Sequence, residues 1–216
     1  MRGRTQLKKN IARLCFFAYL LLLFAISCSD VNIKISTVHH QLVYDYSSKN
    51  STPTVKLSVF AEVSSGDNRI QTVSVKNTTN GMSWTADPAD VVSSSSSKKK
   101  YAGYSSFCMP GSLKFEKAVY QVVYEDKAGK TTDALFTINQ EEADKYASTA
   151  LSKTDKQYLV MGKNGKILYT GANNETFSSS ESVKKTYPEA EYYREYVLNV
   201  DVHAIYLMPA VYIKSE

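Results

Sequence analysis

Apolar and polar residues alternate along much of the chain, which is the pattern of a strand with one buried face. In residues 55–63 the apolar side chains all fall on one face: Val55, Leu57, Val59, Ala61 and Val63. Similar patterns predict strands over residues 70–76 and 82–86. The second of these carries the only tryptophan, Trp84, which we expect to anchor the core.

Two hairpins have clear turn signals. The first joins residues 113–125 to residues 130–138 through Gly129, which suits the positive φ of a bulged turn. The second lies within residues 158–170, where the Asn-Gly pair at 164–165 suits a type I′ turn. Residues 93–100 contain only serine and lysine, so they predict a loop.

Helical spacing is confined to short segments. Asn139 begins a capping-box-like start, and apolar residues then recur at helical spacing to residue 151. Pro188, with acidic residues after it, predicts a second short helix. Residues 198–208 are then expected to form a strand, which Pro209 interrupts.

The strand and turn at residues 120–130 read Tyr-Gln-Val-Val-Tyr-Glu-Asp-Lys-Ala-Gly-Lys. This segment resembles the Tyr-x-Val-x-Tyr-x-Asp-x-x-Gly-Lys motif before the last strand of bacterial immunoglobulin-like domains, although the Cys-Trp-Cys signature of antibody domains is lacking. The resemblance implies a mainly β fold, with an antiparallel immunoglobulin-like sandwich over residues 53–139. A smaller β-rich C-terminal unit with one or two short helices would follow over residues 140–216. Such domains are scaffolds that fix no activity.

The first 27 residues have the features of an export signal. Five basic residues precede residue 14, and residues 14–26 form an uninterrupted apolar run. A membrane-spanning helix needs about 20 apolar residues, so this shorter run favours a cleaved signal peptide over residues 1–27.

Residues 24–28, Phe-Ala-Ile-Ser-Cys, resemble the lipobox of bacterial lipoproteins, although Ala25 stands where leucine is most common. The resemblance implies that Cys28 is the lipid attachment site, carries palmitate-type acyl chains, and begins an anchor and tether over residues 28–52. Plain secretion is the alternative, because residues 25–27 also satisfy the small-x-small rule of ordinary signal peptidase. If Cys28 is lipidated, Cys108 has no partner and is expected to be a small apolar core residue. A Cys28–Cys108 disulfide is the other reading.

The net charge of +5 comes from the predicted signal. The chain has 26 basic and 21 acidic residues, and without the five basic residues before residue 14 the two kinds balance. A neutral body gives no electrostatic footprint for a polyanion, which argues against nucleic acid as a partner.

The sequence contains no recognisable catalytic, cofactor or metal motif, and we expect no cofactor and no metal. A Gly-x-Ser-x-Gly elbow, a phosphate loop and a dinucleotide fingerprint are all missing, and Ser-x-x-Lys occurs only inside the serine-lysine run. His39 and His40 would point to opposite faces of a strand, so we expect them to be solvated near the tether rather than to hold a metal with distant His203. We expect the acidic pairs to serve turns and a helix start: Asp87/Asp90, Glu125/Asp126 and Glu141/Glu142.

Tyrosine is the remaining functional signal. The chain has 16 tyrosines, and six lie in the last 30 residues: Tyr187, Tyr192, Tyr193, Tyr196, Tyr206 and Tyr212. Most are expected to pack in the core, but tyrosine also offers a rigid face with a polar tip for recognition. Because a neutral surface leaves aromatic contact as the main source of affinity, Tyr192 and Tyr193 are the candidate partner contacts.

The sequence therefore predicts a non-catalytic binding or structural module at the cell envelope. It would be held to a bacterial membrane through its lipid, on the periplasmic or surface face, with a protein or carbohydrate partner. The alternative is a secreted or anchored enzyme, or an envelope-assembly subunit, whose site the sequence hides.

Overall fold

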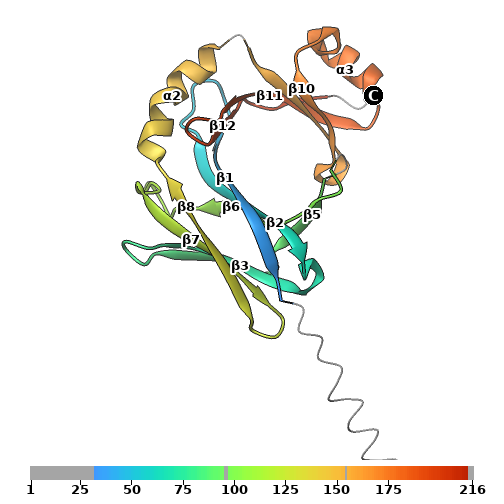
Figure 1. Cartoon of the computed structure of the whole chain (residues 1–216). Helices are drawn as coiled ribbons and strands as arrows, with labels where there is room; N and C mark the ends of the chain where they lie inside the picture. Colours follow the sequence, from blue (N-terminus) through green and yellow to red (C-terminus); the bar gives the residue numbers. More distant parts are fainter. Residues whose placement is uncertain (1–31, 95–96, 154, 214–216) are drawn as a thin grey trace, which may run out of the picture. The chain divides into compact units, whose positions relative to one another are not determined.

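The structure, a computed structural model, describes residues 32–94, 97–153 and 155–213. Over these residues the fold is mainly β, with two sheets and the helices α2 (Gln140–Ser152) and α3 (Ser180–Thr186) (Figure 1). The described residues also form three short 3-10 turns: η1 (Asp67–Arg69) and η2 (Lys163–Gly165), each between two strands, and η3 (Glu175–Ser178), which precedes α3.

The larger sheet, sheet A, draws strands from both halves of the chain. Its members are β1 (Lys34–Asp45), β2 (Thr54–Ser65), β5 (Asp90–Ser93), β6 (Lys100–Cys108), β9 (Gln157–Gly162), β10 (Ile167–Ala172), β11 (Ala190–Asn199), β12 (Ala204–Leu207) and β13 (Val211–Tyr212). The order is β10-β9-β11-β12-β1-β2-β6-β5, and β13 also pairs with β11. The β1–β12 pair is parallel and aligns Leu42 with Ala204, whereas the other pairs are antiparallel.

The smaller sheet, sheet B, is antiparallel throughout. It contains β3 (Ile70–Asn77), β4 (Ser83–Ala86), β7 (Ala118–Asp126) and β8 (Thr131–Ile138), in the order β4-β3-β7-β8.

One face of sheet A carries the core. Alternate residues of β2, among them Leu57, Val59 and Ala61, are fully buried together with Val73 and Val75 of sheet B. Successive side chains of a strand point to opposite faces of the sheet, so every second residue of β2 enters the core. The two sheets therefore pack face to face, as in a β-sandwich.

Helix α2 covers the same face of sheet A farther along. The Tyr44 hydroxyl donates to Asp144 Oδ1 over 2.6 Å, and the Tyr206 hydroxyl donates to the Ala143 carbonyl over 2.6 Å. Asn139 caps the helix, since its side chain accepts from the Glu142 amide over 3.2 Å.

A second, smaller core lies where η3 and α3 pack on β9 and β11. Tyr158 and Phe177 stack with ring centroids 4.1 Å apart, and Val160, Val183 and Ala190 are buried with them. Tyr158 and Val160 share a face with Tyr193, by strand register. The register along β11 and β12 puts this core on the same face of sheet A as the first.

Several predicted elements are confirmed. Strands β2, β3 and β4 lie where the alternation indicated, and β8, α2, β9 and β10 follow the predicted hairpins and helix. Strand β7 forms the first arm of its hairpin but begins at Ala118 rather than at residue 113. At the β9–β10 turn Asn164 and Gly165 have φ values of 58° and 73°, as a type I′ turn requires. Trp84 packs on the core and its ring nitrogen donates to the Cys108 carbonyl over 2.9 Å.

Other expectations are wrong. The second helix ends at Thr186, before Pro188, and the acidic residues after Pro188 belong to or precede strand β11. The predicted strand over residues 198–208 is broken by a turn at residues 200–203. Much of the segment expected to be a tether is strand β1, because its alternate residues Leu42, Tyr44 and Tyr46 enter the core.

Candidate functional site

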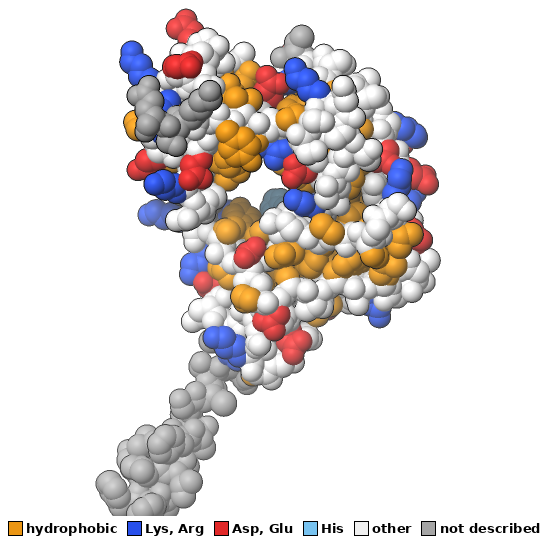
Figure 2. Space-filling model, turned by 180° about the vertical axis from the view of Figure 1, so that it is seen from behind, with side chains coloured by type: hydrophobic (Ala, Val, Ile, Leu, Met, Phe, Trp, Pro, Cys, Tyr) orange, Lys and Arg blue, Asp and Glu red, His pale blue; other side chains and the backbone are white. Residues whose placement is uncertain are grey.

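All the covering elements described above lie on one face of sheet A. The opposite face, here called the open face, is defined by strand register: His39 pairs with Phe60, Gln41 with Ser58, and Val43 with Lys56 and Ile205. The series continues onto β11, where Leu207 pairs with Tyr196. Figure 1 shows sheet A curving round an opening on this side, and the space-filling view in Figure 2 is hollowed there.

An aromatic hollow forms the most apolar part of the open face. His39, Phe60, Val92 and Tyr101 line a shallow depression of about 270 Å³, and the His39 and Tyr101 rings meet edge to face at 5.7 Å. Gly103 lies beneath Phe60, because a Cβ there would come within 2.8 Å of the Phe60 ring and 2.0 Å of the Val59 carbonyl. The glycine thus lets the Phe60 ring lie down on the sheet.

Polar side chains without internal partners lie beside the aromatic hollow. Gln41 and Ser58 are half-buried and face each other across β1 and β2, two residues along from the His39–Phe60 pair. Neither side chain has a hydrogen-bond partner within the described residues. They remain free to bond a ligand.

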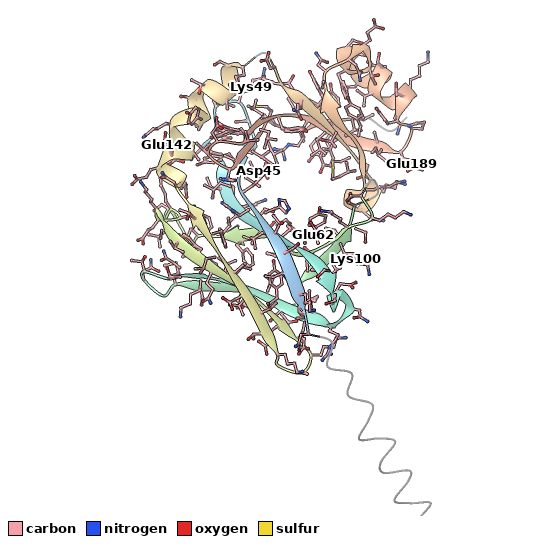
Figure 3. All side chains as sticks on the ribbon, in the orientation of Figure 1. Asp45, Lys49, Glu62, Lys100, Glu142 and Glu189 are labelled. Carbon is pink, nitrogen blue, oxygen red and sulfur yellow. The ribbon has the colours of Figure 1, made fainter. Side chains whose placement is uncertain are left out.

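Charged side chains of the open face neutralise one another. Arg194 contacts Asp45 over 2.6 Å, Lys56 contacts the same carboxylate over 3.4 Å, and Lys99 contacts Glu62 over 2.8 Å. Burial acts to raise the pKa of Asp45, but Arg194 and Lys56 outweigh it and the pKa is lowered. Figure 3 labels Asp45 and Glu62 within the opening that sheet A curves around.

The two tyrosines singled out from the sequence lie on opposite faces of β11. Tyr192 is on the open face and contacts the ring of Tyr212 at 5.6 Å, and Tyr212 is 74% exposed. Tyr193 instead packs into the second core, with its ring centroid 6.4 Å from Tyr158 and 6.3 Å from Phe177. The structure therefore does not join them into one contact surface.

A cavity of about 520 Å³ lies under α2, on the covered side of sheet A. Its polar centre is Asp144, which accepts from the Tyr44 hydroxyl and from Lys114 Nζ, each over 2.6 Å. Burial acts to raise the pKa of Asp144, but these donors lower it, whereas burial and Asp144 raise the pKa of Tyr44. Each oxygen of this carboxylate accepts one hydrogen bond, so Asp144 ties α2 to β1 and to Lys114.

His40 and His203 meet in a second pocket, of about 400 Å³, which Glu142 and Asp201 also line. Their rings lie 4.4 Å apart, and Phe136 lies 4.8 Å from His40 on sheet B. Burial, followed by the charge of His203, lowers the pKa of His40 to about 4. The expectation of two solvated histidines is wrong for His40, because it points inward while His39 points to the open face.

No protein-family model matches the chain, and neither the curated proteins nor the solved structures include a match to it. A function can therefore be inferred only from the positions of the residues themselves. Across the part of the chain that the structure describes, no three His, Cys, Asp or Glu side chains are grouped to hold a metal ion. Over those same residues, no helix is long and apolar enough to cross a membrane.

Cys108, the last residue of β6, lies at the surface. Cys108 is exposed with a free thiol, which donates to the Ser106 carbonyl over 3.4 Å, so the expectation of a core cysteine is wrong. The reason is that Phe107, its neighbour on β6, takes the buried position. Cys28, the predicted lipid site, lies outside the described residues.

Two of the acidic pairs serve structure, as expected. Asp126 closes the β7–β8 turn by accepting from the amides of Ala128 and Lys130 over 2.8 and 2.9 Å. Glu141 and Glu142 lie in the first turn of α2.

The sequence did not single out Phe60 and Tyr101. A signal was present for Phe60, since it is the only aromatic residue on the polar side of the β2 alternation, among Lys56, Ser58 and Glu62. An aromatic side chain on an otherwise polar strand face is a stronger hint of recognition than a count of tyrosines.

Proposed function

We propose that the protein is a lipid-anchored, non-catalytic binding module of the bacterial cell envelope. The observation that carries this proposal is the open face of sheet A, which presents an aromatic hollow although the covering elements all pack on the other side. Ligand sites are concave and mostly apolar with a few polar side chains placed beside them, and the aromatic hollow with its polar neighbours has this composition.

The membrane attachment rests on the sequence. The basic start, the apolar run over residues 14–26 and the lipobox-like segment ending at Cys28 support lipidation of that cysteine. Several acyl chains together hold a protein firmly, since each buried methylene contributes about 0.8 kcal/mol. The anchor would keep the protein at a membrane surface, on its periplasmic or outer side.

Strands β1 to β8 are proposed to form an immunoglobulin-like sandwich. The orders β1-β2-β6-β5 and β4-β3-β7-β8 support this, because they correspond to the A-B-E-D and C′-C-F-G sheets of that fold. On this proposal the sandwich begins at Lys34, earlier than the sequence boundary at residue 53.

Binding is favoured over catalysis by the state of the ionisable groups. Asp144, Asp45 and Glu195 each contact a basic side chain and are held by internal hydrogen bonds. A general acid or base must instead reach a substrate proton.

A pull-down from membranes tests this function. The full chain and its Phe60→Ala variant would be solubilised from the native membrane, with Leu135→Ala as the control, because Leu135 is 63% exposed on sheet B away from the open face. We expect a retained component, protein or glycan, that Phe60→Ala loses and Leu135→Ala keeps. Equal retention by all three proteins would contradict binding at the open face.

A further inference from the structure

We infer that the aromatic hollow binds a neutral sugar unit, with the ring stacked on Phe60 and its hydroxyls bonded to Gln41 and Ser58. This inference rests on the proposed binding function and names its ligand class. The juxtaposition that carries it is a flat aromatic floor beside two half-buried polar side chains without internal partners.

The floor suits the apolar face of a sugar ring. An aromatic face carries negative charge density and attracts C–H groups, which a pyranose presents on one side. Phe60 is already immobilised over Gly103 and flanked by His39 and Tyr101, so stacking on it costs little conformational entropy.

The polar pair suits the hydroxyl groups of the same ring. Two residues along a strand span about 6.6 Å, so Gln41 and Ser58 lie one side-chain step from the floor. A glutamine amide both donates and accepts, and a serine hydroxyl does the same, which matches sugar hydroxyls. Both side chains are partly exposed, so a ligand hydroxyl can replace the water that reaches them.

The charges around the hollow favour a neutral ligand. Asp45 is paired with Arg194 and Lys56, and Glu62 is paired with Lys99, so these groups give neither an anion nor a cation a large net attraction. The hollow, of about 270 Å³ and lined by four residues, is also small, whereas a stable protein interface buries about 800 Å² on each partner. A small rigid unit of a glycan fits this site better than a protein surface.

Calorimetric titration of the full chain tests the inference. The protein would be held in a zwitterionic detergent, because sugar-headed detergents would compete. The probes are hexasaccharides of glucose, mannose, galactose, xylose and N-acetylglucosamine, with oligogalacturonate as an acidic comparison. We expect at least one neutral probe to bind more tightly than the acidic one.

Variants locate the binding. We expect Phe60→Ala to weaken the best probe at least about tenfold, and Gln41→Ala about threefold, with no change in Leu135→Ala. Gln41 lies outside the core and has no internal partner, so its variant remains informative if Phe60→Ala fails to fold.

The outcomes separate this inference from the proposed function. If no neutral probe binds, or if binding survives both face variants, the sugar inference is overturned. The proposed function still stands in that case if the membrane pull-down retains a component that depends on Phe60, and both fail if it does not.

Discussion

His40 couples the stability of this fold to pH. Its pKa is about 4 in the folded chain, against an ordinary value of 6.5, because of burial and the neighbouring charge of His203. His39, Glu142 and Asp201 are the other titratable groups nearby. Between these pH values the unfolded chain binds more protons, so stability is complete above pH 6.5 and falls as the pH drops toward 4.

Urea unfolding at pH 7, 5.5 and 4 checks this expectation. From pH 7 to pH 4 we expect the free energy of unfolding to fall by about 2 kcal/mol more in the wild type than in His40→Gln. This value already allows for the partial exposure of the His40 ring. His39→Gln should keep the wild-type dependence of the free energy of unfolding on pH, since His39 is exposed on the open face. The same fall in the free energy of unfolding for wild type and His40→Gln would show that His40 does not control this pH dependence.

Tyr192 and Tyr193 should separate stability from recognition. Tyr193→Ala removes packing from the second core and is expected to cost about 2–4 kcal/mol. Tyr192→Ala lies on the open face against exposed Tyr212 and should cost less than about 1 kcal/mol. Thermal unfolding and partner retention of the two variants check this, and a strong loss of stability in both would place both tyrosines in the core.

At the scale of single residues, sequence reasoning reached only part of the site. The prediction that His39 and His40 point to opposite faces of a strand is confirmed. Sequence reasoning missed the aromatic hollow, since Phe60 and Tyr101 come from β2 and β6 and meet only through strand pairing. No local pattern reports which strands become neighbours.

Arg194 joins three strands at the middle of sheet A. From β11 it donates to Asp45 on β1 over 2.6 Å and to the Leu207 carbonyl on β12 over 3.3 Å, and its side chain is only 13% exposed. We expect Arg194→Gln to lower the free energy of unfolding by about 2–3 kcal/mol, because a largely buried carboxylate contact is lost.

Lys56→Gln is the matched control for Arg194. Lys56 contacts the same carboxylate over 3.4 Å but is 31% exposed, so its loss should cost less than about 1 kcal/mol. Chemical denaturation of both variants gives the comparison. A larger loss for Lys56→Gln would mean that Arg194 is not the link between β11 and β1.

The segment ending at Cys28 yields a prediction about processing. Intact mass of the membrane-extracted chain is expected to show residues 28–216 plus acyl chains, and Cys108→Ser should not alter this result. Cys28→Ser should abolish the acyl mass. An unmodified mature wild-type chain in the soluble fraction would disprove the anchor.

At the scale of elements, hairpins and the capped helix were readable because their signals are local. The Asn-Gly turn and the cap at Asn139 act within a few residues. The predicted helix after Pro188 is wrong because this segment forms strand β11. Its residues Tyr192, Tyr196 and Val197 pair with strands β9 and β12. Tertiary pairing overrides weak local preference.

The whole molecule shows why the predicted boundary at residues 139 and 140 does not divide sheet A. Strand β12 pairs in parallel with β1, so the C-terminal strands extend the sheet that the first strand begins. Residues from Ile33 onward accordingly form one compact unit. No local pattern reports this long-range pairing, so the sequence alone could not show that the C-terminal strands continue sheet A.

The most direct test of the central claim is cysteine protection of the open face in intact membranes. In a Cys108→Ser background, Val43→Cys would report on the open face and Val123→Cys, also half-buried, on the outer side of sheet B. A maleimide that cannot cross the inner membrane would be added after the outer membrane has been permeabilised. We predict that Val43→Cys is protected in membranes and labelled after purification, whereas Val123→Cys is labelled equally in both states. Equal labelling of Val43→Cys in the two states would contradict a bound partner at the open face.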